Sequence, residues 1–349
     1  MFRTRFTRHG AIALTAGAFL SAGTVLPALA ATQITGAGST FVYPFFSKAF
    51  YEYSQKNKDV EVNYQSIGSG GGIQQFSAKT VDFGASDVPM NADELKRAAG
   101  PVVQVPIALG GEAITYNLPA AVSGGLHLTR QNVADIFLGK ITKWNDAALK
   151  KSNSGADLPD MPIVVVHRSD GSGTTYIFTD FLSHVSAEWK SKVGTGKSVQ
   201  WPAASSVGGK GNEGVAGVVR QQPGAIGYVE LAYVLENKMT SAFLENQSGK
   251  WLTCSERTVA AAAATKPEIS ATDFSIVDRS GANSWPISGY TWVFVYENPT
   301  DKARAKLVRD VLSWTAGDDA QKIAGSLNYV PLPENIQAVA KKALAEVKV

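Results

Sequence analysis

Four short runs of glycine, serine and threonine limit what this chain can fold into more than any other feature. The runs are residues 36–41, 68–72, 82–87 and 168–174. Each offers backbone N–H groups or hydroxyls with little side-chain bulk, so a compact ligand can come close to the main chain. The sequence therefore predicts a site that holds a small anion.

Three of these runs stand between an expected strand and an expected helix. The strand around Ile34 leads into residues 36–41, and Pro44 then opens a helix. Residues 68–72 and 168–174 have the same setting, which places their N–H groups at helix N-termini, where backbone donors are free and the helix dipole favours negative charge. The alternation of strands and helices along the chain predicts an α/β fold.

Asp87 is an acceptor among these donors. In a dry site an ionised carboxylate repels a fully deprotonated oxyanion but accepts a hydrogen bond from a P–OH group. We therefore expect Asp87 to favour protonated phosphate over sulfate. The alternative is a turn aspartate that precedes Pro89.

Residues 1–30 have the pattern of a secretory signal peptide. Three arginines precede the apolar residues 11–25, and the sequence Pro-Ala-Leu-Ala at 27–30 is typical of a cleavage site. A membrane anchor is the alternative, but the apolar stretch is shorter than the roughly 20 residues needed to span a bilayer. We expect the chain to be exported.

Charge gives no support to a nucleic-acid or membrane-surface partner. Lys and Arg together number 33 against 30 Asp and Glu. Without the three arginines of the leader, the positive count becomes 33 − 3 = 30, and the chain is formally neutral. The one cysteine, Cys254, cannot form an internal disulfide, and we expect it to be a buried thiol.

The length of the chain favours two domains. With 349 residues, 44% of them hydrophobic, two ordinary cores are more plausible than one large core. We expect residues 31–106 and 283–349 to form domain I and residues 107–282 to form domain II. The chain would then cross between the domains twice, with the anion loops meeting in the cleft between them.

Two further motifs give no cofactor or metal site. Residues 209–214 fit the dinucleotide pattern G-x-G-x-x-G, but residues 202–206 do not suggest the strand that this pattern requires. We interpret the segment as a helix entry that faces the cleft. The histidines after the leader, His127, His167 and His184, lack the spacing of metal ligands. We expect no cofactor and no metal.

The four runs, in their order, closely resemble the high-affinity phosphate-binding proteins of bacterial phosphate-specific (Pst) ABC transporters. The resemblance extends through residues 135–144, 208–214, 223–229 and 285–286 and covers most of the chain after residue 30. It implies a two-domain periplasmic-binding-protein fold of type II, the Venus-flytrap architecture, with the ligand cleft between the domains.

The resemblance also implies which residues bind phosphate: Thr40, Phe41, Ser69, Asp87, Arg168, Ser172, Gly173 and Thr174. Arg168 would supply a charge-assisted fork that suits two phosphate oxygens. Asp170 would orient the guanidinium group, and its alternative role is a helix N-cap or turn residue.

On this basis we expect a monomeric receptor, not an enzyme, that captures inorganic phosphate and delivers it to an ABC permease in the inner membrane. One alternative is a secreted phosphatase or phosphotransferase with Ser172 or Thr40 as nucleophile, although no base or metal site is evident. Another is an adhesion or signalling protein on the same scaffold, because a fold does not fix a function.

Overall fold

The computed structural model describes residues 31–119 and 125–349. The predicted signal peptide, residues 1–30, lies outside the described residues. The strands are β1 (Thr32–Gly38), β2 (Val60–Ser66), β3 (Phe83–Ser86), β4 (Val102–Tyr116), β5 (His127–Leu128), β6 (Val164–Arg168), β7 (Ser206–Gly209), β8 (Ala225–Glu230), β9 (Phe243–Glu245), β10 (Trp251–Leu252) and β11 (Ser288–Tyr296). The helices are α1 (Tyr43–Lys56), α2 (Ser69–Ser77), α3 (Ala92–Arg97), α5 (Arg130–Phe137), α6 (Ala147–Ser152), α7 (Gly173–Val185), α8 (Ala187–Lys192), α9 (Gly211–Gln221), α10 (Leu231–Glu236), α11 (Glu256–Ala264), α12 (Lys302–Thr315), α13 (Asp318–Ser326) and α14 (Glu334–Ala345).

An eight-stranded sheet runs through the protein in the order β2-β1-β3-β11-β4-β8-β6-β7. Its two ends are parallel: β1 pairs with β2 and β3, and β6 pairs with β7 and β8. The long strands β4 and β11 join these ends and pair with each other in antiparallel fashion. A small sheet of order β10-β9-β5 is separate.

Strand β4 contributes to both halves of the large sheet. Its first part pairs with β11, and residues 112–116 pair with β8. The predicted boundary at residue 106 falls inside this strand, so the chain passes between the two predicted segments without a break in secondary structure. The domain boundaries themselves stay a prediction.

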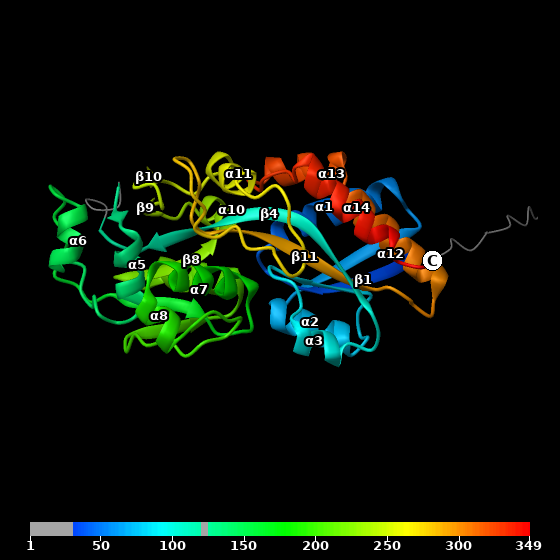
Figure 1. Ribbon diagram of the computed structural model, residues 1–349, viewed down its shortest axis with the longest axis horizontal. Helices are drawn as coiled ribbons and strands as arrows, with labels where there is room; N and C mark the ends of the chain where they lie inside the picture. The colour runs from blue at the N-terminus through cyan, green and yellow to red at the C-terminus, as the bar shows by residue number, and fades with distance from the viewer. Residues whose placement is uncertain (1–30, 120–124) are drawn as a thin grey trace, which may run out of the picture. The chain divides into compact units, whose positions relative to one another are not determined.

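Helices cover both faces of the sheet. Figure 1 shows α1 and α12 to α14 on one side of β1 and β11, with α2 and α3 on the other side. The predicted helix opened by Pro44 is confirmed as α1, whose buried side chains include Phe45, Phe46 and Phe50. They pack in one apolar cluster with Val311 of α12. Each buried phenylalanine contributes about 1.5–3 kcal/mol to the free energy of folding.

The helix after the second glycine-rich run begins earlier than its composition suggests. Residues 73–78 form the apolar part of the expected helix, but α2 begins at Ser69. The glycines are needed for packing: a Cβ atom on Gly72 would lie 2.3 Å from the Cα atom of Gly38. The N-terminus of α2 therefore sits directly on the loop after β1.

Candidate anion site

The glycine-rich loops come together where β1, β3 and β6 end. These strands end at Gly38, Ser86 and Arg168, and the carboxyl ends of parallel strands are the usual place for ligand sites in α/β proteins. The Gly70 N–H donates to the Gly171 carbonyl at 2.8 Å. The Gly173 N–H donates to Ser69 Oγ at 2.9 Å. The second and fourth runs are therefore in direct contact.

Asp87 is buried, with 2% of its surface exposed, and is held by hydroxyl groups. Its Oδ1 atom accepts hydrogen bonds from Ser39 Oγ and, at 2.9 Å, from Thr291 Oγ1. Its Oδ2 atom accepts from Thr174 Oγ1 at 3.5 Å. Burial raises the pKa of Asp87 to about 6, against the opposing effects of these hydrogen bonds and of the Arg168 charge. The carboxyl group therefore faces the loops and not bulk solvent.

Arg168 is held in a fixed orientation by Asp170. Its Nε and Nη2 atoms donate to the two Asp170 oxygens at 2.8 and 2.5 Å. The Nη1 atom donates to Thr174 Oγ1 at 3.1 Å, so Thr174 connects the guanidinium group with Asp87. A bidentate pair of this kind fixes the plane of the guanidinium group. The orienting role predicted for Asp170 agrees with this geometry, and the N-cap of α7 is Ser172, not Asp170.

Thr40 connects the first loop with the far half of the sheet. Its Oγ1 atom accepts from the N–H and from Nδ2 of Asn212, at 3.0 and 2.8 Å. The Thr40 carbonyl accepts from the Tyr233 hydroxyl at 2.6 Å. Asn212 also donates to Thr174 Oγ1 at 3.2 Å. The amide of Asn212 therefore joins the loop after β1 to the N-terminus of α7.

The structure brings all of the predicted phosphate residues to these loops, and all are buried: Thr40, Phe41, Ser69, Asp87, Arg168, Ser172, Gly173 and Thr174. The Ser172 side chain caps α7 by accepting from the Thr175 N–H at 3.0 Å. Phe41 contributes its carbonyl to the Tyr329 hydroxyl. Their roles as phosphate ligands stay a prediction.

Sequence reasoning missed several residues of this network. Ser39 lies within the first run, and its hydroxyl was the available signal. Thr291 lies on the alternating strand β11, where no local pattern marks it. Asn212 is at the start of α9, in the segment interpreted as a helix entry that faces the cleft. The interpretation from sequence that no strand precedes this segment is wrong, because β7 precedes it. The small residues of β7 do not predict a strand, and its parallel pairing with β6 stabilises it.

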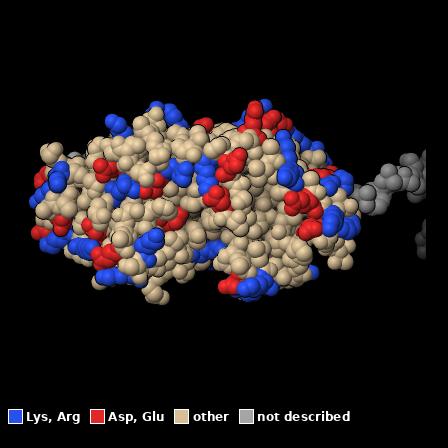
Figure 2. Space-filling model, in the orientation of Figure 1, with Lys and Arg blue, Asp and Glu red and all other residues tan. Residues whose placement is uncertain are grey.

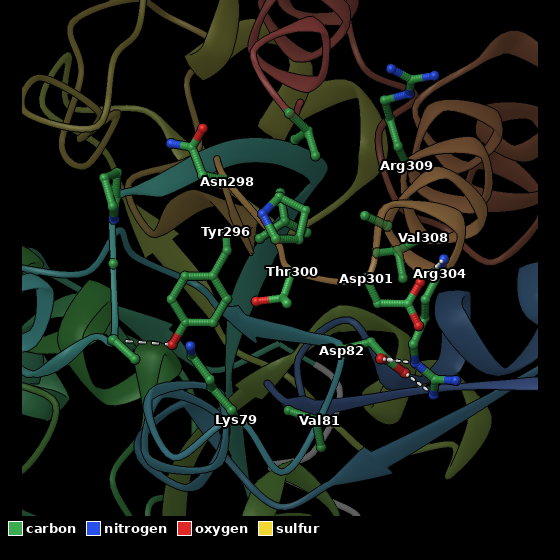
Figure 3. A pocket seen from close by; sticks show the side chains of 17 residues that line it. Lys79, Val81, Asp82, Tyr296, Asn298, Thr300, Asp301, Arg304, Val308 and Arg309 are labelled. Carbon is green, nitrogen blue, oxygen red and sulfur yellow. Dashed lines mark hydrogen bonds and ion pairs between the residues drawn. The ribbon is translucent and has the colours of Figure 1, made fainter. Parts of the chain in front are cut away.

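Asp82 points away from the anion loops. Its carboxylate accepts from the Thr35 N–H at 2.7 Å and pairs with Arg304 of α12. Figure 3 shows this pair at the edge of a separate pocket of about 250 Å³, which Tyr296 and Lys79 also line. The beginning of the third run is therefore structural, and only its end belongs to the anion site.

The surface carries both signs of charge. Figure 2 shows lysine, arginine, aspartate and glutamate side chains interspersed on the visible face. Within residues 31–119 and 125–349, no helix has the length and apolar character to cross a membrane. Over the same ranges, no three His, Cys, Asp or Glu side chains are grouped so as to hold a metal ion.

Comparison with solved structures supports the fold. A high affinity periplasmic phosphate-binding protein bound with phosphate superposes with a TM-score of 0.72 at 22% identity, over 89% of this chain and 93% of that chain. A putative phosphate ABC transporter substrate-binding protein from Clostridium perfringens gives 0.63 at 21%, over 86% and 100%. The two-domain α/β fold of the periplasmic binding proteins is confirmed.

Comparison of sequences gives the family. The model of the PBP superfamily domain matches residues 26–319. The phosphate-binding protein PstS of Xylella fastidiosa is 48% identical over 306 residues, which are 87% of this chain and 82% of that protein. PstS of Haemophilus influenzae is 44% identical over 326 residues, covering 92% and 95%. The chain therefore belongs to the PstS family of phosphate-binding proteins within the PBP superfamily.

Proposed function

We propose that this protein captures inorganic phosphate at the anion site and delivers it to the permease of an ABC transporter. The observation that carries the proposal is the buried constellation of Arg168, Thr174 and Asp87, in which one hydroxyl joins a fixed cation to a hydrogen-bond acceptor. The relatives compared above are named as phosphate-binding proteins, which favours a binder and not an enzyme.

The charges of the site suit a hydrogen phosphate ion. Arg168 and the N–H groups at the start of α7 and α2 attract the anion. Because the pKa of Asp87 is about 6, most Asp87 carboxylates are ionised at neutral pH. An ionised Asp87 accepts a hydrogen bond from P–OH, whereas sulfate has no proton to donate at this pH and would meet the buried negative charge of Asp87 without a hydrogen bond between them.

Closure of the cleft would complete the site. Contacts already cross between the two predicted domains: Thr40 with Asn212, Ser69 with Gly173, and Glu94 with Lys197. The Lys197 ammonium lies 2.6 Å from a Glu94 oxygen, and both side chains are largely buried. Excluding water strengthens every polar contact to the ligand. Scattering curves that are identical with and without phosphate would contradict this closing mechanism.

The phosphatase alternative is not favoured by the local geometry. Ser172 Oγ accepts from the Thr175 N–H, and Thr40 Oγ1 accepts twice from Asn212. In the described part of the chain, neither hydroxyl is hydrogen bonded to a His, Lys, Asp or Glu side chain that could act as a base. A nucleophile without an adjacent base or metal is weak.

Calorimetric titration with phosphate, arsenate and sulfate, beside a turnover assay with a phosphate ester, tests the proposal. We expect tight binding of phosphate, weak binding of sulfate and no hydrolysis. Failure to bind phosphate, or steady release of phosphate from the ester, would overturn it. Export to the periplasm, a monomeric state and contact with permease subunits are part of the same proposal.

A further inference from the structure

Glu112 of β4 is a buried acid for which the network described above has no role. Its exposed fraction is 0%. Neither of its carboxylate oxygens has a hydrogen-bond partner among residues 31–119 and 125–349. A carboxylate that is buried without hydrogen bonds or a counter-charge is costly, so such a group binds a proton more readily than an exposed one.

The strand register places Glu112 on the face that carries the anion site. Thr291 of β11 lies opposite Ala108, and Gly289 lies opposite Gly110, with no break between them. Because side chains alternate along a strand, Ala108, Gly110 and Glu112 share the face of Thr291, and the Thr291 hydroxyl donates to Asp87. Glu112 therefore lies on the same face of the sheet as Thr291, four residues along β4 from Ala108, the residue opposite Thr291.

The neighbouring elements confirm this placement. On the same face, a Cβ atom added to Gly289 would lie 2.5 Å from Ile177 of α7. The first turn of α7 contains Gly173 and Thr174. Across the antiparallel pair of β4 and β8, Glu112 lies opposite Glu230, which caps α10 by accepting from the Ala232 N–H.

The charged and titratable groups around Glu112 come from several elements. Burial raises the pKa of Glu112 well above its ordinary value. The charges of Asp87, directly after β3, and of Glu230 in β8 raise this pKa further, whereas the charge of Arg168 in β6 lowers it. Glu112 in turn raises the pKa of Tyr228 and of Cys254, whose own burial is the larger cause. The same groups that define the anion site therefore act on Glu112.

We propose that Glu112 is a second proton-binding group of the phosphate site, and that it takes up a proton from solvent when phosphate binds. This inference rests on the proposed function. A neutral Glu112 tolerates an anion in the loops above it, whereas an ionised Glu112 repels that anion. The proton binds a carboxylate oxygen of Glu112, and no covalent bond to phosphate forms or breaks.

The sign of the effect follows from linkage. A bound anion stabilises the protonated form of Glu112, so the pKa of the group is higher in the complex than in the free protein. Phosphate affinity is then greatest below the pKa of the free protein and falls up to tenfold for each pH unit between the two pKa values. Removal of the ionisable group abolishes this part of the pH dependence.

The test uses Glu112→Gln, which has nearly the same shape but no charge, and Glu112→Met as a second non-ionisable variant in case the amide impairs folding. Asp180→Asn is the matched control, because Asp180 is also an acid whose pKa burial raises, and its partners, Ser275 and His184, lie outside the anion loops. Dissociation constants for inorganic phosphate are measured by calorimetry from mildly acidic to alkaline pH, in pairs of buffers with different protonation enthalpies.

Phosphate ionisation changes the wild-type and the variant dissociation constants by the same factor at each pH, so its effect cancels in their ratio. We expect this ratio to rise with pH, by up to tenfold per unit, for both Glu112 variants and to stay constant for Asp180→Asn. Both Glu112 variants should also take up fewer protons on binding. Infrared difference spectra should show a protonated carboxylic acid appearing with phosphate in the wild type but not in Glu112→Gln.

A pH-independent ratio with unchanged proton uptake in both Glu112 variants would overturn the inference while leaving the proposed function intact. Absence of phosphate binding by the wild type at every pH would instead overturn the proposed function.

Discussion

Replacement of Asp87 by asparagine should narrow the preference for phosphate over sulfate. On the role proposed for Asp87, the variant loses the charge that rejects a fully deprotonated oxyanion and the acceptor for a P–OH group. A hydrogen bond to a charged group contributes about 1.5–3 kcal/mol. This free energy corresponds to a fall in the selectivity ratio of about 10- to 150-fold, since 1.4 kcal/mol is a factor of ten.

Competition calorimetry with phosphate and sulfate measures this ratio. The matched control is Asp82→Asn, because Asp82 lies in the same glycine-rich run but pairs with Arg304, away from the loops. We expect the control to lose stability and to keep its selectivity. If Asp87→Asn keeps the wild-type ratio, or if both variants change it equally, the role assigned to the Asp87 carboxylate is wrong.

Three further results are expected. Because the pKa of Asp87 rises from 3.8 to about 6 on folding, ionisation of Asp87 lowers the stability of the phosphate-free protein by about 3 kcal/mol. In melting experiments Asp87→Asn should therefore gain stability relative to the wild type as pH rises between these two values. A stability difference that does not change with pH would contradict the pKa shift. Asn212→Ala removes bonds from the amide to two loops, so phosphate should bind about tenfold more weakly, measured by calorimetry. Lys197→Met breaks the ion pair with Glu94 and should speed phosphate release in stopped-flow experiments. Lys192→Met, which breaks only an exposed pair within α8, should leave the release rate unchanged. If Lys197→Met releases phosphate at the wild-type rate, the Lys197–Glu94 pair has no part in the closing mechanism.

The sequence was sufficient to predict the loops, because their chemistry is local. The glycines at positions 70 and 72 predict close approach of the backbone, and the Arg-Ser-Asp-Gly-Ser-Gly-Thr run predicts donors for an anion. Neither prediction depends on the rest of the chain. Pro44 likewise predicts the start of α1, and the apolar periodicity of residues 302–315 predicts a helix with the bounds of α12.

Contacts that depend on tertiary pairing could not be predicted. Thr291 becomes a partner of Asp87 only because β11 inserts between β3 and β4, and nothing near residue 291 encodes that order. Glu112 is similar, since an isolated glutamate in an apolar strand gives no sign of which face it occupies. In the last part of the chain the sequence predicts helices over residues 302–315 and 335–347 but not α13, because the apolar residues of α13 are mostly alanines, which give a weak periodic signal.

The continuity of the large sheet has a mechanical consequence. Since β4 pairs with both β11 and β8, the two ends of the sheet cannot separate by sliding apart without breaking backbone hydrogen bonds. Movement that keeps these bonds has to flex β4, the strand common to both ends, and its pairing with β11 is irregular between Thr291 and Trp292, next to the residue that holds Asp87. This irregularity in the strand pairing thus adjoins the acid to which we assign the choice between phosphate and sulfate.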